Sequence, residues 1–330
     1  MFLYVIKHGA VLGISGGLLT VKYPDMTEEA FPKQTIEGIS IFSKVLMTTA
    51  CVEFCLTNNI SVGYFTMTGH YYGRLVPVMN SNVQRLRKQI QLSGDERFSV
   101  RLAQRIIKAK ISNQLVVARR YSKNDSATSD NRKILRVSKD KVSTACSLYK
   151  LIGFEGIASK NYFATLSNAI EEGFAFEGRN RRPAVDPFNC MLNIGYSILT
   201  KEIVGEIENR GLNPYVGFIH KDKVGHPTLA SDLIEEWRPV IVDSLVMSMI
   251  QGHEVCLEDF IVDENGCRLK DDALRLFISK LERRLETKNN YLIYLDSPLS
   301  FRSSIWHQVD RLSRAIDKED PEIYYPIIIR

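Results

Sequence analysis

The hydrophobic pattern of the chain changes once, at about Val83, and this change limits the folds that the chain can adopt. Before it, short apolar runs rich in β-branched residues are separated by glycines and other turn residues, which is typical of strands. The candidate strands are residues 3–6, 10–14, 18–21, 36–41, 60–66 and 72–77, with one candidate helix at 48–58. We therefore predict that residues 1–85 form a small β-rich domain, sandwich-like and with one helix.

After Val83 the apolar residues recur at the spacing of amphipathic helices, and they do so to about Trp306. The candidate helices are residues 97–118, 139–153, 159–169, 187–209, 228–251 and 270–286. Residues 122–132 are predicted to form a polar connector. The tail 319–330 contains two prolines and leaves two alternatives, disorder or docking on a neighbour. We predict that residues 86–330 form a larger all-α domain, which makes the chain an α+β protein.

Composition and charge exclude some classes of function. The apolar start, MFLYVIKHG, is too short for the core of a signal peptide. No run approaches the ~20 apolar residues that cross a bilayer, so we predict a cytoplasmic protein without membrane insertion. The six cysteines include no C-x-x-C pair, which disfavours a zinc module and favours a reducing compartment. A net charge of +5 permits a polyanionic partner without requiring one.

Three polar side chains lie where their chemistry is unexpected. Glu155 interrupts the apolar, glycine-flanked stretch LIGFEGIA, where a carboxylate is costly unless something pairs with it. His220 follows the turn GLNP and ends a hydrophobic run. Glu235 lies on a predicted helix face with Asp232 and Arg238, because the three are spaced by three residues. Taken singly, each has a plain structural explanation: a capping or ion-paired glutamate, a core or loop histidine, and a solvated helix face.

Taken together, two carboxylates and a neutral imidazole form a ligand set for a hard or borderline divalent cation, Mg²⁺ or Mn²⁺. Such an ion bridges phosphate oxygens and stabilises the attacking and leaving oxygens of a phosphoryl transfer. The three side chains are far apart along the chain, so the fold has to bring them together.

Three segments, GFEGIASKNYFATL, GLNPYVGFIH and LASDLIEEWRP, resemble in that order the signature segments of the CRISPR-associated adaptation integrases, the Cas1 family. The segment VLMTTACVEFCLTNNISVGYFTMTGHYYGRL looks like the β-domain of that family. A further segment, NCMLNIGYSIL, with Asn193 and Tyr196, looks like its central helix. The resemblance covers almost the whole chain, and the motifs are specific as a set.

The resemblance implies roles for particular residues. Glu155, His220 and Glu235 fall at the metal ligands of the family, and Asp232 matches a second acidic position that assists in the site. Some members have aspartate at the position of Glu235, which leaves open which of Asp232 and Glu235 contacts the metal.

The resemblance also implies an activity and partners. The expected reaction inserts foreign DNA fragments into the CRISPR array, by attack of a 3′-hydroxyl on a phosphodiester of the repeat. If water attacks the phosphodiester instead, the same site acts as an endonuclease. The expected substrate is double-stranded DNA, both prespacer and repeat. The expected assembly is a homodimer, with residues 1–85 as the dimerisation domain, joined to the small CRISPR-associated partner Cas2 in a heterohexameric complex.

Basic residues cluster on a predicted helix and in a predicted loop, where they suit DNA phosphates. The candidate DNA contacts are Arg97, Arg101, Arg105, Lys108, Arg179, Arg181, Arg182 and Arg238. For the four on the helix, the alternative is a solvated face. No sequence-reading motif is present, so binding through the DNA backbone and shape is expected.

Two other functions remain open from the sequence. A non-catalytic DNA-binding scaffold of the same fold explains the basic residues, but it does not explain two glutamates and a histidine at the matching positions. A metal hydrolase acting on a small phosphate ester is compatible with the composition. Duplex DNA would not compete with the substrate of such an enzyme.

Overall fold

The structure is a computed structural model, and it describes residues 1–76, 82–121, 126–180, 183–264, 266–290 and 297–329. The strands of the N-terminal part are β1 (Phe2–Val5), β2 (Val11–Ser15), β3 (Leu18–Lys22), β4 (Glu28–Phe31), β5 (Gly38–Phe42), β6 (Leu46–Met47), β7 (Ser61–Phe65) and β8 (Tyr71–Leu75). They form two four-stranded sheets, with the orders β1-β5-β7-β8 and β4-β3-β2-β6. In the first sheet β1, β5 and β7 are parallel, and β8 runs antiparallel to β7.

The two sheets and helix α1 (Thr49–Thr57) share one hydrophobic cluster. Leu12 from one sheet and Ile39 from the other are fully buried in it, together with Cys51 and Cys55 of α1. Helix α1 begins after Thr48, whose hydroxyl accepts a hydrogen bond from the Cys51 backbone N–H. Both cysteines are buried free thiols, as predicted.

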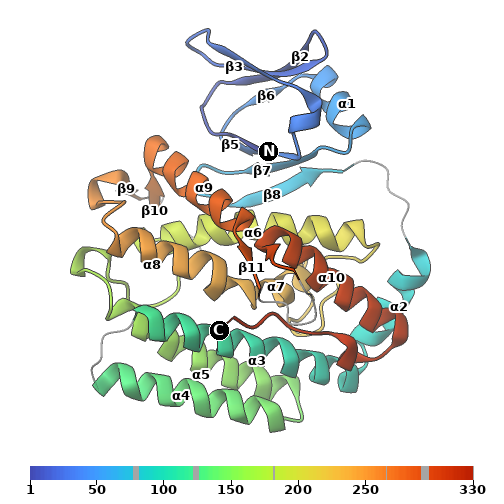
Figure 1. The fold of residues 1–330 in the computed structure, drawn as a ribbon, viewed down its shortest axis with the longest axis vertical. Coiled ribbons are helices and arrows are strands. Elements are labelled where there is room, and N and C mark those ends of the chain that lie inside the picture. The colour runs from blue at the N-terminus through green and yellow to red at the C-terminus, as the bar shows by residue number, and fades with distance from the viewer. Residues whose placement is uncertain (77–81, 122–125, 181–182, 265, 291–296, 330) are drawn as a thin grey trace.

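Helices form most of the remaining structure. They are α2 (Val83–Ser93), α3 (Glu96–Tyr121), α4 (Ser126–Thr144), α5 (Leu148–Ser167), α6 (Pro187–Asn209), α7 (Thr228–Ile234), α8 (Ser244–Gln251), α9 (Asp271–Glu286) and α10 (Phe301–Lys318). Two small antiparallel pairs accompany them, β9 (Phe260–Asp263) with β10 (Gly266–Leu269) and β11 (Lys288–Asn289) with β12 (Leu299–Ser300). Helices α3, α4 and α5 pack on one another at the end of the molecule opposite the sheets, and α6 lies against β8 (Figure 1).

The strand-rich N-terminal part and the mostly helical remainder confirm the predicted α+β fold class. The two short strand pairs in the helical part are additions to the predicted all-α domain. The domain boundary at residue 85 stays a prediction, and that position lies within α2. Of the helices in the described part of the chain, none combines the length and apolarity needed to span a membrane.

Helix α5 corrects the sequence prediction, which placed a break at residues 154–158 between two helices. The structure has one continuous helix through this segment. Ser147 caps its first turn by accepting a hydrogen bond from a backbone N–H of that turn. Gly153 and Gly156 cost the helix about 1 kcal/mol each relative to alanine, but packing on α3 and α4 offsets that cost. Glu155 therefore projects from a helix and not from a turn.

Helix α4 corrects the polar connector predicted at residues 122–132. Residues 122–125 lie outside the described residues, and the chain is helical from Ser126. Leu135 and Val142 are seven residues apart and both fully buried, so one face of α4 packs on the neighbouring helices while its many polar residues face solvent.

The predicted helix at 228–251 is present but changes its geometry in the middle. Helix α7 ends at Ile234, and a π-helical segment (Arg238–Asp243) leads into α8. Pro239 has no N–H to continue the ordinary helical ladder, and such π-helical turns are frequent at functional sites. Asp232 and Glu235 on this stretch are almost completely buried, which excludes the solvated helix face.

The C-terminal tail docks on its own chain. Tyr324 and Ile327 are fully buried beside α3, where the C-terminus lies in Figure 1. Glu236 receives two hydrogen bonds from the tail, one from the Tyr324 hydroxyl (2.5 Å) and one from the Ile327 backbone N–H (2.7 Å). The Ile329 backbone N–H donates to Asn113 of α3 (2.9 Å). Burial raises the pKa of the Glu236 carboxyl to about 8.

Two adjacent isoleucines test the docking of the tail. Ile327 is 0% exposed and Ile328 is 43% exposed. Ile327→Ala is expected to lower the free energy of unfolding by about 2–5 kcal/mol, because it leaves a cavity in the core. Ile328→Ala is expected to lower it by less than about 1 kcal/mol. Equal effects of the two substitutions in chemical denaturation would contradict a docked tail.

Candidate active site

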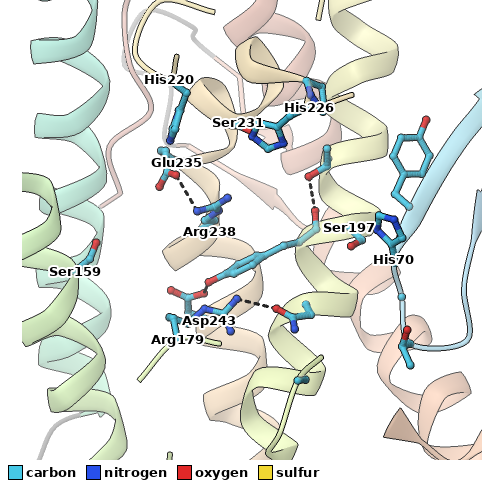
Figure 2. Close-up of a pocket in the computed structure, with 18 of the residues that line it drawn as sticks. His70, Ser159, Arg179, Ser197, His220, His226, Ser231, Glu235, Arg238 and Asp243 are labelled. Atoms are coloured by element: carbon cyan, nitrogen blue, oxygen red, sulfur yellow. Dashed lines mark hydrogen bonds and ion pairs between the residues drawn. The ribbon is translucent and has the colours of Figure 1, made fainter. Parts of the chain in front are cut away.

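A cavity of about 1500 Å³ is lined by the three candidate metal ligands, Glu155, His220 and Glu235. Glu155 reaches it from α5, His220 from the loop after α6, and Glu235 from the end of α7. The β7–β8 hairpin and α6 complete the walls. Figure 2 shows His220, Glu235 and Arg238 in a row along one wall. The fold thus brings the three predicted ligand residues to one pocket.

Lys110 of α3 lies between the two glutamates. Its Nζ contacts Glu155 Oε1 and lies 2.5 Å from Glu235 Oε2, and its side chain is only 7% exposed. Burial alone lowers the pKa of the ammonium, but the Glu235 and Glu155 carboxylates outweigh burial and hold that pKa above its usual value. Lys110 is therefore an ion-pair partner shared by both carboxylates.

Glu235 is held by a second cation as well. Arg238 Nη1 donates to Glu235 Oε1 (2.8 Å), so each carboxylate oxygen faces a positive group. Burial raises the pKa of Glu235, but Arg238 and Lys110 outweigh it and bring that pKa down to about 2. Glu235 is therefore fully ionised at neutral pH. The other glutamate, Glu155, receives a further hydrogen bond from the Ser159 hydroxyl (2.7 Å), one turn along α5.

Asp232 orients His220 and does not line the cavity. Its fully buried carboxylate accepts the backbone N–H groups of Phe218 (2.7 Å), Ile219 (3.0 Å) and His220 (3.1 Å). The His220 Nδ1 lies 2.7 Å from Asp232 Oδ1, and this hydrogen bond raises the pKa of the imidazole. With Nδ1–H donated to Asp232, the lone pair of Nε2 is free to bind a ligand.

A divalent metal ion fits the residue types at this site. In the part of the chain that the structure describes, no three His, Cys, Asp or Glu side chains stand close enough to hold a metal. The Lys110 ammonium lies between two of the candidate ligands, Glu155 and Glu235. Two carboxylates and an imidazole that is oriented by a further carboxylate are residue types that suit a divalent ion.

Two arginines that line the cavity contact one aromatic ring. The centroid of the Tyr196 ring is 4.9 Å from Arg238 Cζ and 5.2 Å from Arg179 Cζ. The hydroxyls of Tyr196 and Tyr162 both donate to Asp243 (2.9 Å from Tyr162). Burial raises the pKa of the Asp243 carboxyl to about 6, although the two hydroxyls lower it. The buried carboxylate thereby holds the ring that supports both guanidinium groups.

The four candidate DNA contacts on α3 lie outside the cavity. On α3, Arg97 and Lys108 are exposed. Arg105 pairs with Glu322 of the tail (2.6 Å), and Arg101 lies 3.7 Å from the same carboxylate. Arg181 and Arg182 lie outside the described residues. The stripe on α3 is therefore partly a surface for the tail.

Sequence reasoning missed Lys110 and Asp243. The signal for Lys110 is its register, because it lies four residues after Ile106 and three after Ile107 and therefore shares their apolar face. A lysine on a buried face needs carboxylate partners. Asp243 carries the signal used for Glu155, because it interrupts the apolar stretch VIVDSLVM. Its two tyrosine partners come from α5 and α6, which that signal does not reveal.

Comparisons with known proteins agree on one family. The family model of CRISPR associated protein Cas1 matches residues 3–283. CRISPR-associated endonuclease Cas1 of Mycobacterium tuberculosis is 36% identical over 278 residues, which are 84% of this chain and 80% of that protein.

Two solved structures have a similar fold. A casposase bound to integration product has a TM-score of 0.85 and 24% identity, covering 100% of this chain and 95% of that chain. A chain of a Cas6-RT-Cas1–Cas2 complex has a TM-score of 0.85 and 22% identity, covering 99% of this chain and 36% of that longer chain. From the family model and the close relative, the chain belongs to the Cas1 family of CRISPR-associated proteins.

Proposed function

We propose that the chain is a metal-dependent DNA endonuclease and integrase of CRISPR adaptation, which inserts foreign DNA fragments by attack of a 3′-hydroxyl on a repeat phosphodiester. The observation that carries the proposal is the convergence of Glu155, His220 and Glu235 from three segments on one cavity, with His220 oriented by Asp232. The relative from M. tuberculosis is an endonuclease by name, and the similar casposase structure contains an integration product.

Each side chain has a defined task in this reaction. Glu155, His220 and Glu235 hold Mg²⁺ or Mn²⁺, which supplies charge neutralisation for the transition state of the phosphoryl transfer. Asp232 keeps the proton on His220 Nδ1, so that Nε2 is the ligating atom. Arg179 and Arg238, which line the cavity, bind phosphate oxygens of the DNA. The reaction needs no covalent nucleophile from the protein.

The substrate and the assembly follow the same proposal. The substrate is double-stranded DNA, both prespacer and CRISPR repeat, in the cytoplasm. Outside the cavity, Arg97 and Lys108 are the main contacts to the DNA backbone, because Arg101 and Arg105 already pair with Glu322. The β-rich residues 1–85 serve as the dimerisation domain of a homodimer. The homodimer joins the small partner Cas2 in a heterohexamer. The similar structure of a Cas6-RT-Cas1–Cas2 complex supports the choice of Cas2 as the partner.

A non-catalytic DNA-binding scaffold is the second candidate, because Lys110 stands between the two carboxylates that have to hold the metal. Strand transfer separates the two functions. The purified protein with Cas2 is incubated with a prespacer and a supercoiled plasmid bearing the repeat, with and without Mn²⁺. Joined products only with Mn²⁺ support the integrase, whereas DNA binding without products supports the scaffold.

Replacement of His220 tests its place in the reaction. His220→Ala is expected to lower strand transfer by at least about 10-fold, since loss of a ligand costs no less than loss of the group that orients it. Folding and duplex binding are expected to stay unchanged, because 41% of the His220 side chain is exposed. His8→Ala, at an exposed histidine of the β-rich part, is the matched control. Full strand transfer by the His220 variant excludes that residue from the mechanism.

Asp232→Asn tests the orienting role of that carboxylate. The amide retains the volume but has one acceptor oxygen for four donors, so the free energy of unfolding is expected to fall by about 1–3 kcal/mol. The apparent Mn²⁺ affinity in strand transfer is expected to fall by about 10–100-fold. Excess Mn²⁺ should restore the rate, because the three ligands remain. A rate that stays low at saturating Mn²⁺ contradicts a purely orienting role.

A further inference from the structure

Lys110 is placed unlike an ordinary structural lysine. Its ammonium contacts two carboxylates that come from separate elements, Glu155 on α5 and Glu235 just after α7. All three residues line the cavity, although only 7% of the Lys110 side chain is exposed. Lys108, a second lysine on α3, is exposed to solvent.

We propose that Lys110 is a tethered cation that competes with the divalent ion for the Glu155 and Glu235 carboxylates, and that the chain thereby sets its own metal affinity. The inference rests on the proposed function, because it assigns the metal to these residues. It adds a residue that determines how readily the metal-binding state forms.

Charge balance supports competition. Without a metal, the two carboxylates are matched by two cations, Lys110 and Arg238, so the buried group carries no net charge. A divalent ion among the same side chains, with Lys110 still in place, adds two positive charges in a region of low dielectric, where their repulsion is strong. Withdrawal of the ammonium from the carboxylates relieves that repulsion. Metal binding and the Lys110 ion pairs therefore exclude each other.

The side chain is able to withdraw. A lysine ammonium is a point charge on a four-carbon stem with many rotamers, unlike the rigid planar fork of arginine. Arg238 is anchored differently, because its guanidinium also stacks on the Tyr196 ring (4.9 Å). Of the two cations at Glu235, Lys110 is therefore the one that a metal displaces.

The size of the effect follows from the population of sites that are free of the ammonium. The apparent metal affinity is the intrinsic affinity multiplied by that fraction. If Lys110 occupies the carboxylates in nine of ten metal-free molecules or more, removing its charge strengthens metal binding by about tenfold or more. The same removal leaves two like charges with one counterion, so the metal-free protein becomes less stable.

The test is the Mn²⁺ affinity of the full chain, measured by calorimetry without DNA, for wild type, Lys110→Met and Lys108→Met. Methionine keeps the apolar stem and removes the charge. Lys110→Met is expected to bind Mn²⁺ at least about tenfold more tightly than wild type, and Lys108→Met is expected to match wild type. Binding at this site is the part that is lost when His220→Ala is added to each variant. Thermal unfolding is expected to show a lower Tm for metal-free Lys110→Met and a larger rise in Tm with Mn²⁺.

Two further measurements keep the proposal testable if Lys110→Met folds poorly. Lys110→Arg retains the positive charge and is expected to bind Mn²⁺ no more tightly than wild type. In the wild-type chain, labelling of Lys110 by an amine-reactive ester, read by mass spectrometry, is expected to increase when Mn²⁺ is added, while labelling of Lys108 stays constant.

The outcomes separate the inference from the proposed function. Mn²⁺ binding by Lys110→Met that equals or falls below wild type overturns the competition and leaves the metal site in place. Unchanged Lys110 labelling in the Mn²⁺-bound wild type also overturns it. No His220-dependent Mn²⁺ binding by any variant overturns the proposed metal site, and the competition with it.

Discussion

Two like-charged carboxylates meet in one cavity, and the arrangement of the surrounding helices depends on the cations that neutralise them. Repulsion between such groups grows as the surrounding dielectric falls. Lys110 of α3 removes it by pairing with Glu155 of α5 and with Glu235 at the end of α7, and Arg238 pairs with the second Glu235 oxygen. These ion pairs join three segments at the point where the proposed chemistry takes place. Under the proposed function, the contacts that stabilise the metal-free protein are also the ones that govern metal affinity.

The three carboxylates of residues 232–236 contact three different parts of the molecule. Asp232 organises the loop that presents His220, Glu235 lines the cavity, and Glu236 receives the C-terminal tail. Just after this stretch, at Pro239, the backbone changes from α-helical to π-helical geometry. This change alters the directions in which the following side chains point. Arg238 can thus reach both Glu235 and the Tyr196 ring. One helical segment thereby connects the site with the tail.

Local patterns predicted the fold class well and some element boundaries poorly. The switch from strand-like to helical periodicity was visible because burial of one face repeats with the period of the element. Glycine was the misleading signal, since Gly153 and Gly156 lie inside α5, where packing on two neighbouring helices outweighs their poor helix propensity. The polar residues at the start of α4 led to the wrong prediction of a connector, because a helix can carry polar residues on the face that it exposes to solvent.

The sequence by itself determined the α+β architecture, the family and the candidate residues Glu155, His220 and Glu235, because residue type and order along the chain carry that information. Only the tertiary structure decided that Asp232 orients the histidine and that Lys110 stands between the glutamates. Both assignments depend on which oxygen faces which donor across segments that are distant in sequence. Electrostatic interactions act through space, and their partners are chosen by the packing of helices that no local spacing encodes.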